Sequence, residues 1–402
     1  MKRSIIVFAI VLISFITFNV KALELDINSK NAILYNLDNN EILYEKDDET
    51  KIQIASLTKI MTALVTLDKV DDLDKQIIIT SEDLKGLSEA NLVTAGFTVG
   101  EVVTYRDLLY GLLLPSGADA ANALARSVAG SNEEFVNLMN EKAKELKLKN
   151  TNFSNPIGLD DENNYSTAKE LSIIFNKAIK NETFKTIITS KEYQTSDGKL
   201  TLKSTIQKNA SRYGIEVPYI LGGKTGTTDG AGLCLATIAT SNDVNYLLVT
   251  TGATYDKIRP HNIDDAKIIY DYFIQNYGNH KIVDKEKSYK SLKTKYLEQD
   301  EIKLYPNEDI IKYVPNEYNE KDIKYKYDGV EEVNIFTKKK LGKLKIYYKD
   351  ELLKEEDVLL KIKCHFSLSK FIKENILYIS LGFIAIILII IFVTKKRKKS
   401  LR

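Results

Sequence analysis

One apolar run constrains this chain more than any other feature of its sequence. Residues 376–394 carry no charged side chain, and a basic tail begins directly after them. As a helix, this run of 19 residues would span about 28 Å, close to the hydrocarbon thickness of a bilayer. We expect a transmembrane helix at 376–394 rather than a buried core helix, which is seldom so long and so free of charge. Basic residues favour the cytoplasmic side, so 395–402 should be a cytoplasmic tail and the body extracytoplasmic, in a single-pass cell-membrane protein.

A second, shorter apolar run opens the chain. Lys2 and Arg3 precede it, and it ends in small residues at Ala22. This order is typical of a secretory signal, so we expect residues 1–22 to be a signal peptide that is cleaved after Ala22. A short buried helix is the alternative, but a run behind two charges at the start of a chain favours the signal.

The charges are distributed unevenly. Three positive residues lie in the predicted signal and six in the tail, and setting these nine aside changes the net charge from +2 to −7. A body of that sign does not favour nucleic acid as a partner. Cys234, Cys364 and the three histidines show no disulfide or metal-ligand spacing, so we expect no metal and no cofactor.

The pattern of apolar residues divides the body into two domains. The first, at 23–281, mixes both periodicities: a hairpin is expected at 30–48, helices from Ala55 and at about 119–128, 132–146 and 264–277, and strands at 233–238 and 246–250. This mixture predicts an α+β domain. The second, at 282–365, should be a small all-β domain without a catalytic cluster. Its short alternating runs lie at 323–327, 333–336, 344–348 and 358–362.

Ser56 and Lys59 open the first predicted helix. Residues three apart share a helix face, so the two side chains can meet. A serine hydroxyl needs a base to become a nucleophile, and a lysine whose pKa is lowered can be that base. Taken alone, the pattern is also compatible with a solvated helix face.

A glycine-rich segment at 221–227 contains the second candidate group. Lys224, Thr225 and Thr227 together suit a small anion such as a carboxylate, and the glycines let a ligand approach the backbone. A phosphate-binding loop is the competing interpretation, but it requires a glycine where Pro218 stands. Between the two motifs, Ser116 lies in a segment that could enter the same site as a proton shuttle or form an ordinary turn.

The ordered combination is more specific than its parts, because Ser-x-x-Lys, Ser-Gly and Lys-Thr-Gly in sequence characterise penicillin-interacting serine enzymes. Over about residues 25–365 the chain resembles serine-type D-alanyl-D-alanine carboxypeptidases, the low-molecular-weight penicillin-binding proteins. The matching segments are Ala55-Ser56-Leu57-Thr58-Lys59, Thr98-Val99-Gly100-Glu101, Leu114-Pro115-Ser116-Gly117, Asn155-Pro156-Ile157-Gly158-Leu159 and Gly223-Lys224-Thr225-Gly226. The resemblance implies a penicillin-binding-protein/β-lactamase-like transpeptidase domain, followed by a β-rich domain that lifts it from the membrane.

The resemblance also implies roles for single residues. Ser56 would be the nucleophile, Lys59 its general base and Ser116 a proton relay. Lys224 would supply positive charge. The substrate carboxylate would be held in the Lys-Thr-Gly segment, by Thr225, Gly226 and Thr227, with the backbone N–H groups of Ser56 and Thr227 forming the oxyanion hole. Arg259 is our candidate for the arginine that follows this segment in the family, with an ordinary surface arginine as the alternative.

Ala118 departs from the family pattern, which has asparagine at the end of the middle motif. Asn122 could replace the missing amide, the rate or preference could differ, or the protein could bind without efficient turnover. We expect retained activity, because nucleophile, base and relay remain. The expected partners are peptidoglycan stem peptides and, as covalent inhibitors, β-lactams. A DD-endopeptidase, a β-lactamase and a non-catalytic wall-binding scaffold are the alternatives.

Overall fold

The structure, a computed structural model, describes residues 23–256 and 259–400. The predicted signal peptide at 1–22 lies outside these residues. The chain divides into two compact units, one ending at Ile274 and the other beginning at Gln275. Each unit has a hydrophobic core of its own.

A five-stranded antiparallel sheet forms the framework of unit 1, in the order β2–β1–β11–β10–β9. Its strands are β1 (Asn31–Asn36), β2 (Glu41–Lys46), β9 (Ile220–Thr228), β10 (Gly232–Ser241) and β11 (Val244–Ala253). The hairpin expected at 30–48 is the β1–β2 pair. Asn242 and Asp243, both with positive φ, join β10 to β11 in a two-residue turn of the kind that suits a twisted hairpin. The strand β9, which carries the Lys-Thr-Gly segment, lies at one edge of the sheet.

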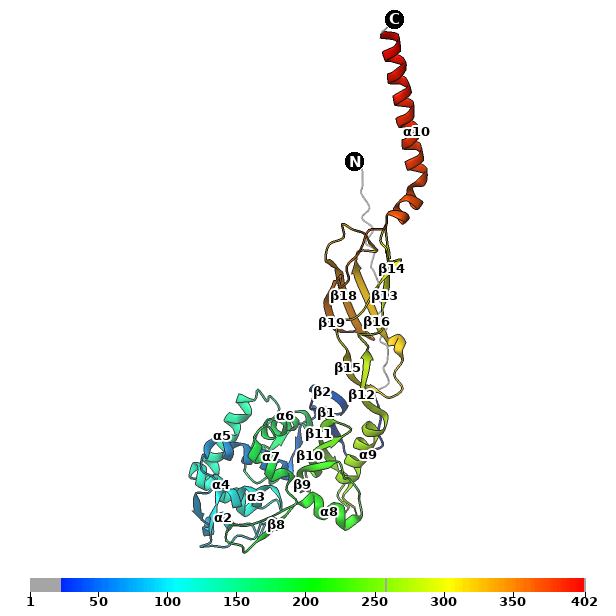
Figure 1. The fold of residues 1–402 in the computed structure, drawn as a ribbon. Helices are drawn as coiled ribbons and strands as arrows, with labels where there is room; N and C mark the ends of the chain where they lie inside the picture. The colour runs from blue at the N-terminus through cyan, green and yellow to red at the C-terminus, as the bar shows by residue number, and fades with distance from the viewer. Residues whose placement is uncertain (1–22, 257–258, 401–402) are drawn as a thin grey trace, which may run out of the picture. The chain divides into compact units, whose positions relative to one another are not determined.

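Helices cover both faces of this sheet, with α2 to α7 on one side and α9 on the other (Figure 1). Their bounds are α1 Thr58–Lys69, α2 Ser81–Leu84, α3 Tyr105–Leu113, α4 Ala118–Ala129, α5 Asn132–Glu145, α6 Ala168–Ala178, α7 Glu182–Thr189, α8 Thr205–Tyr213 and α9 His261–Asn276. Helix α1 is the central one: it packs against α3 to α7, and its first nine residues are all buried. Its buried hydroxyls are paired, because Thr62 donates to the carbonyl oxygen of Pro156 and Thr66 to that of Thr62. Three short strand pairs complete the unit: β3 Ile52–Gln53 with β6 Tyr165–Ser166, β4 Gln76–Ile78 with β5 Val102–Thr104, and β7 Glu192–Gln194 with β8 Thr201–Lys203.

Unit 2 consists of β-strands followed by one long helix. The strands are β12 Tyr277–Val283, β13 Lys290–Thr294, β14 Glu301–Leu304, β15 Ile310–Pro315, β16 Ile323–Gly329, β17 Glu332–Val333, β18 Lys340–Tyr348 and β19 Glu351–Leu359. They form three sheets, β12–β15, β14–β13–β17 and β16–β18–β19. The all-β character expected from the sequence is therefore present. One detail was wrong: Ile335 and Phe336, expected in a strand at 333–336, lie in an exposed turn after β17.

The chain continues into α10 (Leu368–Ser400), a helix that contains the predicted span at 376–394. Residues 368–397 are long and apolar enough to cross a membrane, and the most apolar part of the helix is not buried against protein. In water such a surface would be costly to expose, at roughly 25 cal/mol per Å² of apolar area. Length, composition and exposure together fit a bilayer as the surrounding medium.

Candidate active site

Ser56 lies at the entrance to the central helix. It belongs to the 3₁₀ turn η1 (Ala55–Leu57), which continues directly into α1. Ala55 has a φ of +45°, a left-handed conformation that costs a non-glycine residue about 1–2 kcal/mol. Ser56 lines a cavity of about 660 Å³. Strained backbone beside a half-buried hydroxyl that lines a cavity is a feature of functional sites, where the surrounding fold stabilises the strain.

Lys59 meets Ser56 as the three-residue spacing predicts. Its Nζ donates hydrogen bonds to Ser56 Oγ at 3.0 Å and to the carbonyl oxygen of Ile157 at 2.5 Å. Burial, opposed by the negative charge of Asp119, lowers the pKa of Lys59 to about 7. Near neutral pH a large share of this amine is therefore unprotonated and able to accept the Ser56 proton.

A second lysine–serine pair faces the first. Lys224 is fully buried on β9, and its Nζ donates to Ser116 Oγ at 2.7 Å and to the carbonyl oxygen of Thr225 at 2.7 Å. Burial first, and then the charge of Lys59, lower the pKa of Lys224 well below its ordinary range. Ser116 has a φ of +72°, so it too holds a left-handed conformation that its residue type disfavours. The segments around residues 56, 116 and 224, distant in sequence, thus converge on one site.

The predicted anion-binding residues Thr225, Gly226 and Thr227 line the same cavity as Ser56 and Ser116. Thr225 Oγ1 lies 2.7 Å from Thr205 Oγ1, at the start of α8. Gly226 lies close to the turn that holds Ser56: a Cβ on Gly226 would lie 3.1 Å from the Ser56 nitrogen, so an alanine there would push its neighbours aside by a few tenths of an ångström. The edge of β9 therefore lies directly beside Ser56.

Three basic residues that the sequence analysis did not single out also line the cavity. Lys203 ends β8, and Lys208 and Arg212 lie one turn apart on α8. No acidic residue is among the lining residues. The cavity wall is therefore cationic, although the predicted body of the protein is acidic overall. No sequence signal distinguished these residues from surface lysines, because α8 has no motif of its own.

Arg259 is placed differently from the other predicted residues. It lies just before α9, and its guanidinium forms a two-bond ion pair with Asp264, one bond of which measures 2.8 Å. Its side chain is 55% exposed, and the residue does not line the cavity that holds Ser56. A role for Arg259 in carboxylate binding stays a prediction.

Asp119 has a structural role that the sequence did not reveal. It lies in the first turn of α4, as expected, but its carboxylate is fully buried. It accepts hydrogen bonds from the backbone N–H groups of Ala95, Gly96 and Phe97, at 2.7, 3.0 and 3.1 Å. These bonds hold the segment that carries Val93, which lines the cavity. The contact crosses more than twenty residues of sequence, so no local pattern could have predicted it.

Asn122 does not replace the amide that the family pattern has at position 118. Ala118 is buried, and its N–H donates to the carbonyl oxygen of Val93 at 2.9 Å. Asn122 uses both ends of its amide elsewhere: Nδ2 donates to the carbonyl oxygen of Asp83 at 3.1 Å, and Oδ1 accepts from Asn132 at 3.0 Å. The backbone carbonyl of Ile157 is instead the second partner of the Lys59 amine.

Gly158 explains how the loop that carries Ile157 reaches the nucleophile. Its φ is +84°, and a Cβ at this position would lie 2.0 Å from the carbonyl oxygen of Ala55. Only glycine combines this backbone conformation with so close an approach. Asn155 caps the loop, because its Oδ1 accepts from the N–H groups of Gly158 at 2.7 Å and Leu159 at 3.0 Å. The loop therefore holds the Ile157 carbonyl within hydrogen-bond distance of Lys59.

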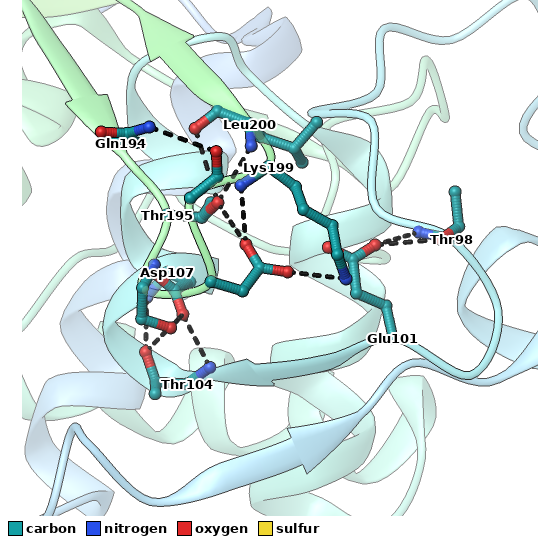
Figure 2. A network of polar contacts seen from close by, with 11 residues as sticks. Thr98, Glu101, Thr104, Asp107, Gln194, Thr195, Lys199 and Leu200 are labelled. Atoms are coloured by element: carbon teal, nitrogen blue, oxygen red, sulfur yellow. Dashed lines mark hydrogen bonds and ion pairs between the residues drawn. The ribbon is translucent and has the colours of Figure 1, made fainter.

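A polar network fixes the β7–β8 hairpin. Figure 2 shows part of it, with Thr104 bonded to Asp107 and Thr195 bonded to Leu200 across the hairpin turn. Asp107 caps α3 through Thr104 and also accepts hydrogen bonds from Ser196 Oγ at 2.6 Å and Tyr193 Oη at 3.0 Å. Burial acts to raise the pKa of Asp107, but the bonds from Ser196 and Thr104 outweigh it and hold the pKa below its ordinary range. The hairpin is thereby tied to α3, and its strand β8 contributes Thr201 to the cavity wall.

Comparison with known proteins identifies the family of this chain. The family model for D-alanyl-D-alanine carboxypeptidases (Peptidase_S11) covers residues 17–255. The chain is 32% identical over 347 residues to D-alanyl-D-alanine carboxypeptidase DacF of Bacillus subtilis, which covers 84% of this chain and 86% of that protein. It is 34% identical over 244 residues to D-alanyl-D-alanine carboxypeptidase DacC of Escherichia coli, over 58% of each chain.

Solved structures agree with these relatives. The Streptomyces K15 DD-transpeptidase is 32% identical, with a TM-score of 0.56 over 62% of this chain and 98% of that chain. Penicillin binding protein 5 from Haemophilus influenzae, 23% identical, has a TM-score of 0.61 over 85% of this chain and 99% of that chain, which shows the shared fold. The family model matches more than half of this sequence, and DacF matches most of it. The chain therefore belongs to the D-alanyl-D-alanine carboxypeptidase family of serine peptidases.

Proposed function

We propose that this enzyme removes the terminal D-alanine from peptidoglycan stem peptides ending in D-alanyl-D-alanine, through an acyl-enzyme on Ser56. The observation that carries the proposal is the 3.0 Å contact between Lys59 Nζ and Ser56 Oγ, on the wall of a cavity that also holds Ser116 and the edge of β9. A neutral amine beside a hydroxyl is the arrangement that an activated serine requires.

Acylation follows from this geometry. Lys59 accepts the Ser56 proton while Oγ attacks the carbonyl carbon of the penultimate D-alanine, and the backbone N–H groups of Ser56 and Thr227 stabilise the oxyanion. Ser116, hydrogen-bonded to Lys224, gives its proton to the leaving nitrogen and takes up the proton that Lys59 had accepted, so Lys59 is neutral again. The C–N bond breaks, free D-alanine leaves, and an ester on Ser56 remains. Water then attacks the ester, with Lys59 as the base, which restores Ser56.

Recognition of the substrate's terminal carboxylate is assigned to the Lys-Thr-Gly segment. Thr225 and Thr227 can donate hydrogen bonds to it, and the ammonium form of Lys224, which a bound carboxylate favours, adds positive charge. A β-lactam presents a reactive amide carbonyl and a carboxylate to the same groups. Because its leaving group stays attached after ring opening, we expect it to remain as a covalent ester on Ser56.

We further propose that α10 anchors the enzyme in the cell membrane, with the catalytic unit outside and the C-terminus in the cytoplasm. The support is the apolar run at 376–394 and the basic residues that follow it. This location would give the enzyme access to cell-wall peptides, which are its proposed substrates.

Mass spectrometry of a pentapeptide ending in D-alanyl-D-alanine tests the function. Incubation with the detergent-solubilised enzyme should release one D-alanine, and Ser56→Ala should lower the rate by a factor on the order of 10⁴ or more. Ser190→Ala is a matched control, because that hydroxyl bonds the Thr186 carbonyl within its own turn of α7. Release of D-alanine by Ser56→Ala at the wild-type rate would refute the mechanism.

The same samples separate the alternatives. A fluorescent penicillin should label the wild type on Ser56 and persist, whereas rapid hydrolysis of the label would indicate a β-lactamase and absence of label a scaffold. A cross-linked dimer of stem peptides, cut faster than the pentapeptide loses D-alanine, would indicate an endopeptidase.

A further inference from the structure

A turn in unit 2 presents an aromatic side chain for which the proposed reaction has no use. It spans 334–337, between β17 and β18. Phe336 N–H donates to Asn334 Oδ1 at 2.9 Å, Asn334 N–H donates to Thr337 Oγ1 at 2.8 Å, and Thr337 N–H donates to the Asn334 carbonyl at 3.1 Å. These bonds fix the turn, and they leave Phe336 88% exposed and Ile335 48% exposed. Exposing two neighbouring apolar side chains to water is unfavourable, and a contiguous apolar surface of this kind often marks a site that binds another surface.

Three lysines, Lys338 to Lys340, follow this apolar tip directly. Lys340 is paired with Asp357 at 2.7 Å. In the part of the chain that the structure describes, Lys338 and Lys339 have no ion pair. The segment 334–339, here called the docking turn, therefore combines an aromatic and an aliphatic tip with two uncompensated positive charges.

Backbone hydrogen bonds place the docking turn next to the start of α10. On one side, Val333 accepts from the N–H of Lys295 at 2.9 Å, and the neighbouring Tyr296 accepts from the N–H of Ser367 at 2.8 Å, one residue before the helix. On the other side, Lys339 accepts from the N–H of Leu360 at 2.7 Å. The turn is thus held between the segment at 295–296, which bonds Ser367, and the segment that begins at Leu360 and leads to the helix.

The first turns of α10 are themselves fastened to this end of the unit. Lys370 Nζ donates to Asp300 Oδ1 at 2.7 Å, and Asn375 Nδ2 donates to Tyr296 Oη at 3.0 Å. The ring of Phe371 lies edge-on against Tyr296, with centroids 5.0 Å apart. A bilayer that receives residues 376–394 would therefore begin close to the docking turn.

We propose that the docking turn seats on the surface of the same membrane, with Phe336 in the headgroup region and Lys338 and Lys339 against anionic phosphates. The proposal rests on the proposed membrane span of α10. Aromatic side chains favour the interface between water and hydrocarbon, and lysines beside a span are attracted to anionic headgroups within a Debye length. A lipid surface is favoured over a protein partner because the chain's own anchor brings that surface to the turn. Docking at this second point would limit how far unit 2 can tilt on its anchor.

Tryptophan fluorescence tests the proposal directly, because the chain contains no tryptophan. Phe336→Trp in the full-length protein gives a single reporter on an exposed position, where the substitution leaves the fold intact. The protein is placed in nanodiscs of phosphatidylcholine, with or without phosphatidylglycerol. With the anionic lipid we expect a shift of emission to shorter wavelength and quenching by acyl chains that carry bromine, both reduced by added salt.

Ile311→Trp is the matched reporter. Its side chain is 66% exposed, but it lies on β15, which pairs with β12 and not with the strands next to α10. Its emission should not depend on the lipid. In the Phe336→Trp background, Lys338→Glu with Lys339→Glu should abolish the response, whereas Lys285→Glu with Lys321→Glu, an equal change of charge at exposed positions, should preserve it.

Two results would overturn the proposal. If Phe336→Trp behaves like Ile311→Trp in both lipid compositions, the turn does not dock. If it responds equally in both compositions and the lysine substitutions change nothing, anionic headgroups are not the partner. A chain that fails to enter nanodiscs contradicts the anchor instead, and the same emission measured with vesicles of both compositions then decides whether the turn docks.

Discussion

At the residue scale, the chemistry of the site depends on two buried amines that each face one serine. Lys59 contacts Ser56, and Lys224 contacts Ser116. Burying an ammonium group is expensive unless a full countercharge accompanies it. The buried carboxylate of Asp119 opposes the lowering of the Lys59 pKa, but its oxygens accept hydrogen bonds from backbone N–H groups. The fold therefore holds Lys59 close to the balance between its charged and neutral forms.

The rate of acylation should rise with pH through about 7. The pKa of Lys59 lies near that value, and the neutral amine is the form that can take the Ser56 proton. The second-order rate of labelling by a fluorescent penicillin, measured between about pH 5 and pH 9, checks this. A rate that is flat or falls through neutrality would contradict it.

The same shift has a consequence for stability with an unusual sign. Between about 7 and the ordinary lysine value of 10.5, the unfolded chain binds more protons at Lys59 than the folded chain does. The contribution of this residue to the unfolding free energy should therefore increase as pH rises through that window. Urea unfolding of wild type and Lys59→Met at several pH values isolates this contribution.

Strain at Ser116 can be separated from its chemistry. Ser116→Gly removes both the hydroxyl and the cost of a positive φ, whereas Ser116→Ala removes the hydroxyl alone. Both variants should lose acylation, but the glycine variant should be more stable than the alanine variant by about 1–2 kcal/mol. Urea unfolding gives the difference, and equal stability would show that the left-handed conformation at this position carries no strain.

At the scale of single elements, the site is assembled by loops that press against the start of α1. The loop at 155–159 supplies the Ile157 carbonyl to Lys59, and Asp119 fixes the segment at 95–97. Both depend on backbone contacts between segments that are distant in sequence. Positioning of this kind is sensitive to small displacements, because reacting atoms must stay within about 3–3.5 Å.

Gly158→Ala should therefore disrupt catalysis more than its position outside the Ser-x-x-Lys, Ser-Gly and Lys-Thr-Gly motifs suggests. The new Cβ would lie 2.0 Å from the Ala55 carbonyl oxygen, so the loop must move away from Ser56. We expect acylation to fall at least about tenfold, with a loss of stability of about 1–3 kcal/mol. Gly100→Ala is the control, because its φ of +83° matches while nothing lies within 4 Å of its Cβ. Equal effects on acylation would mean that strain, and not the close approach, is responsible.

These elements also mark how far the sequence alone could lead. Helical spacing predicted that Ser56 and Lys59 would meet, and the motif order predicted that Lys224 and Ser116 would join them. Asp119 and Gly158 were not predictable in their roles, because each acts through a backbone contact that no local periodicity encodes. Helix α8, with Lys208 and Arg212, was missed because it has few apolar residues: only Ile206 and Ala210 are buried. The turn at Phe336 was predicted as a strand, because alternating apolar and polar residues do not show where the hydrogen bonds between two strands stop.

At the scale of the whole molecule, the proposed catalytic site and the proposed membrane anchor lie in different units. The predicted boundary at 281 and the division after Ile274 both fall near β12, which leads from α9 into the β-rich part. The proposed catalytic residues Ser56, Lys59, Ser116 and Lys224 all lie in unit 1. Unit 2 carries α10, and its strands enclose a separate core.

Removal of α10 should therefore detach the enzyme from the membrane without abolishing its acylation by penicillin. A chain that ends at Ser367 should move from the membrane fraction to the soluble fraction, while its labelling by fluorescent penicillin stays within about twofold, because substitutions and deletions far from a site act independently of it. Cell fractionation followed by labelling measures both. Retention of the shortened chain in the membrane fraction would show that another segment provides the anchor.

The buried pair Lys59 and Lys224 has a final consequence, which concerns protons exchanged with the solvent. A carboxylate that enters the cavity brings negative charge close to both amines and so favours their ammonium forms. Binding should then draw protons from the buffer and tighten as the solution becomes more acidic, as calorimetry of Ser56→Ala with a D-alanyl-D-alanine peptide in buffers of different ionisation enthalpy would reveal. Attack by Ser56 requires the opposite state of Lys59. Binding of the carboxylate thus favours protonated Lys59, whereas cleavage of the peptide bond requires that Lys59 has lost this proton.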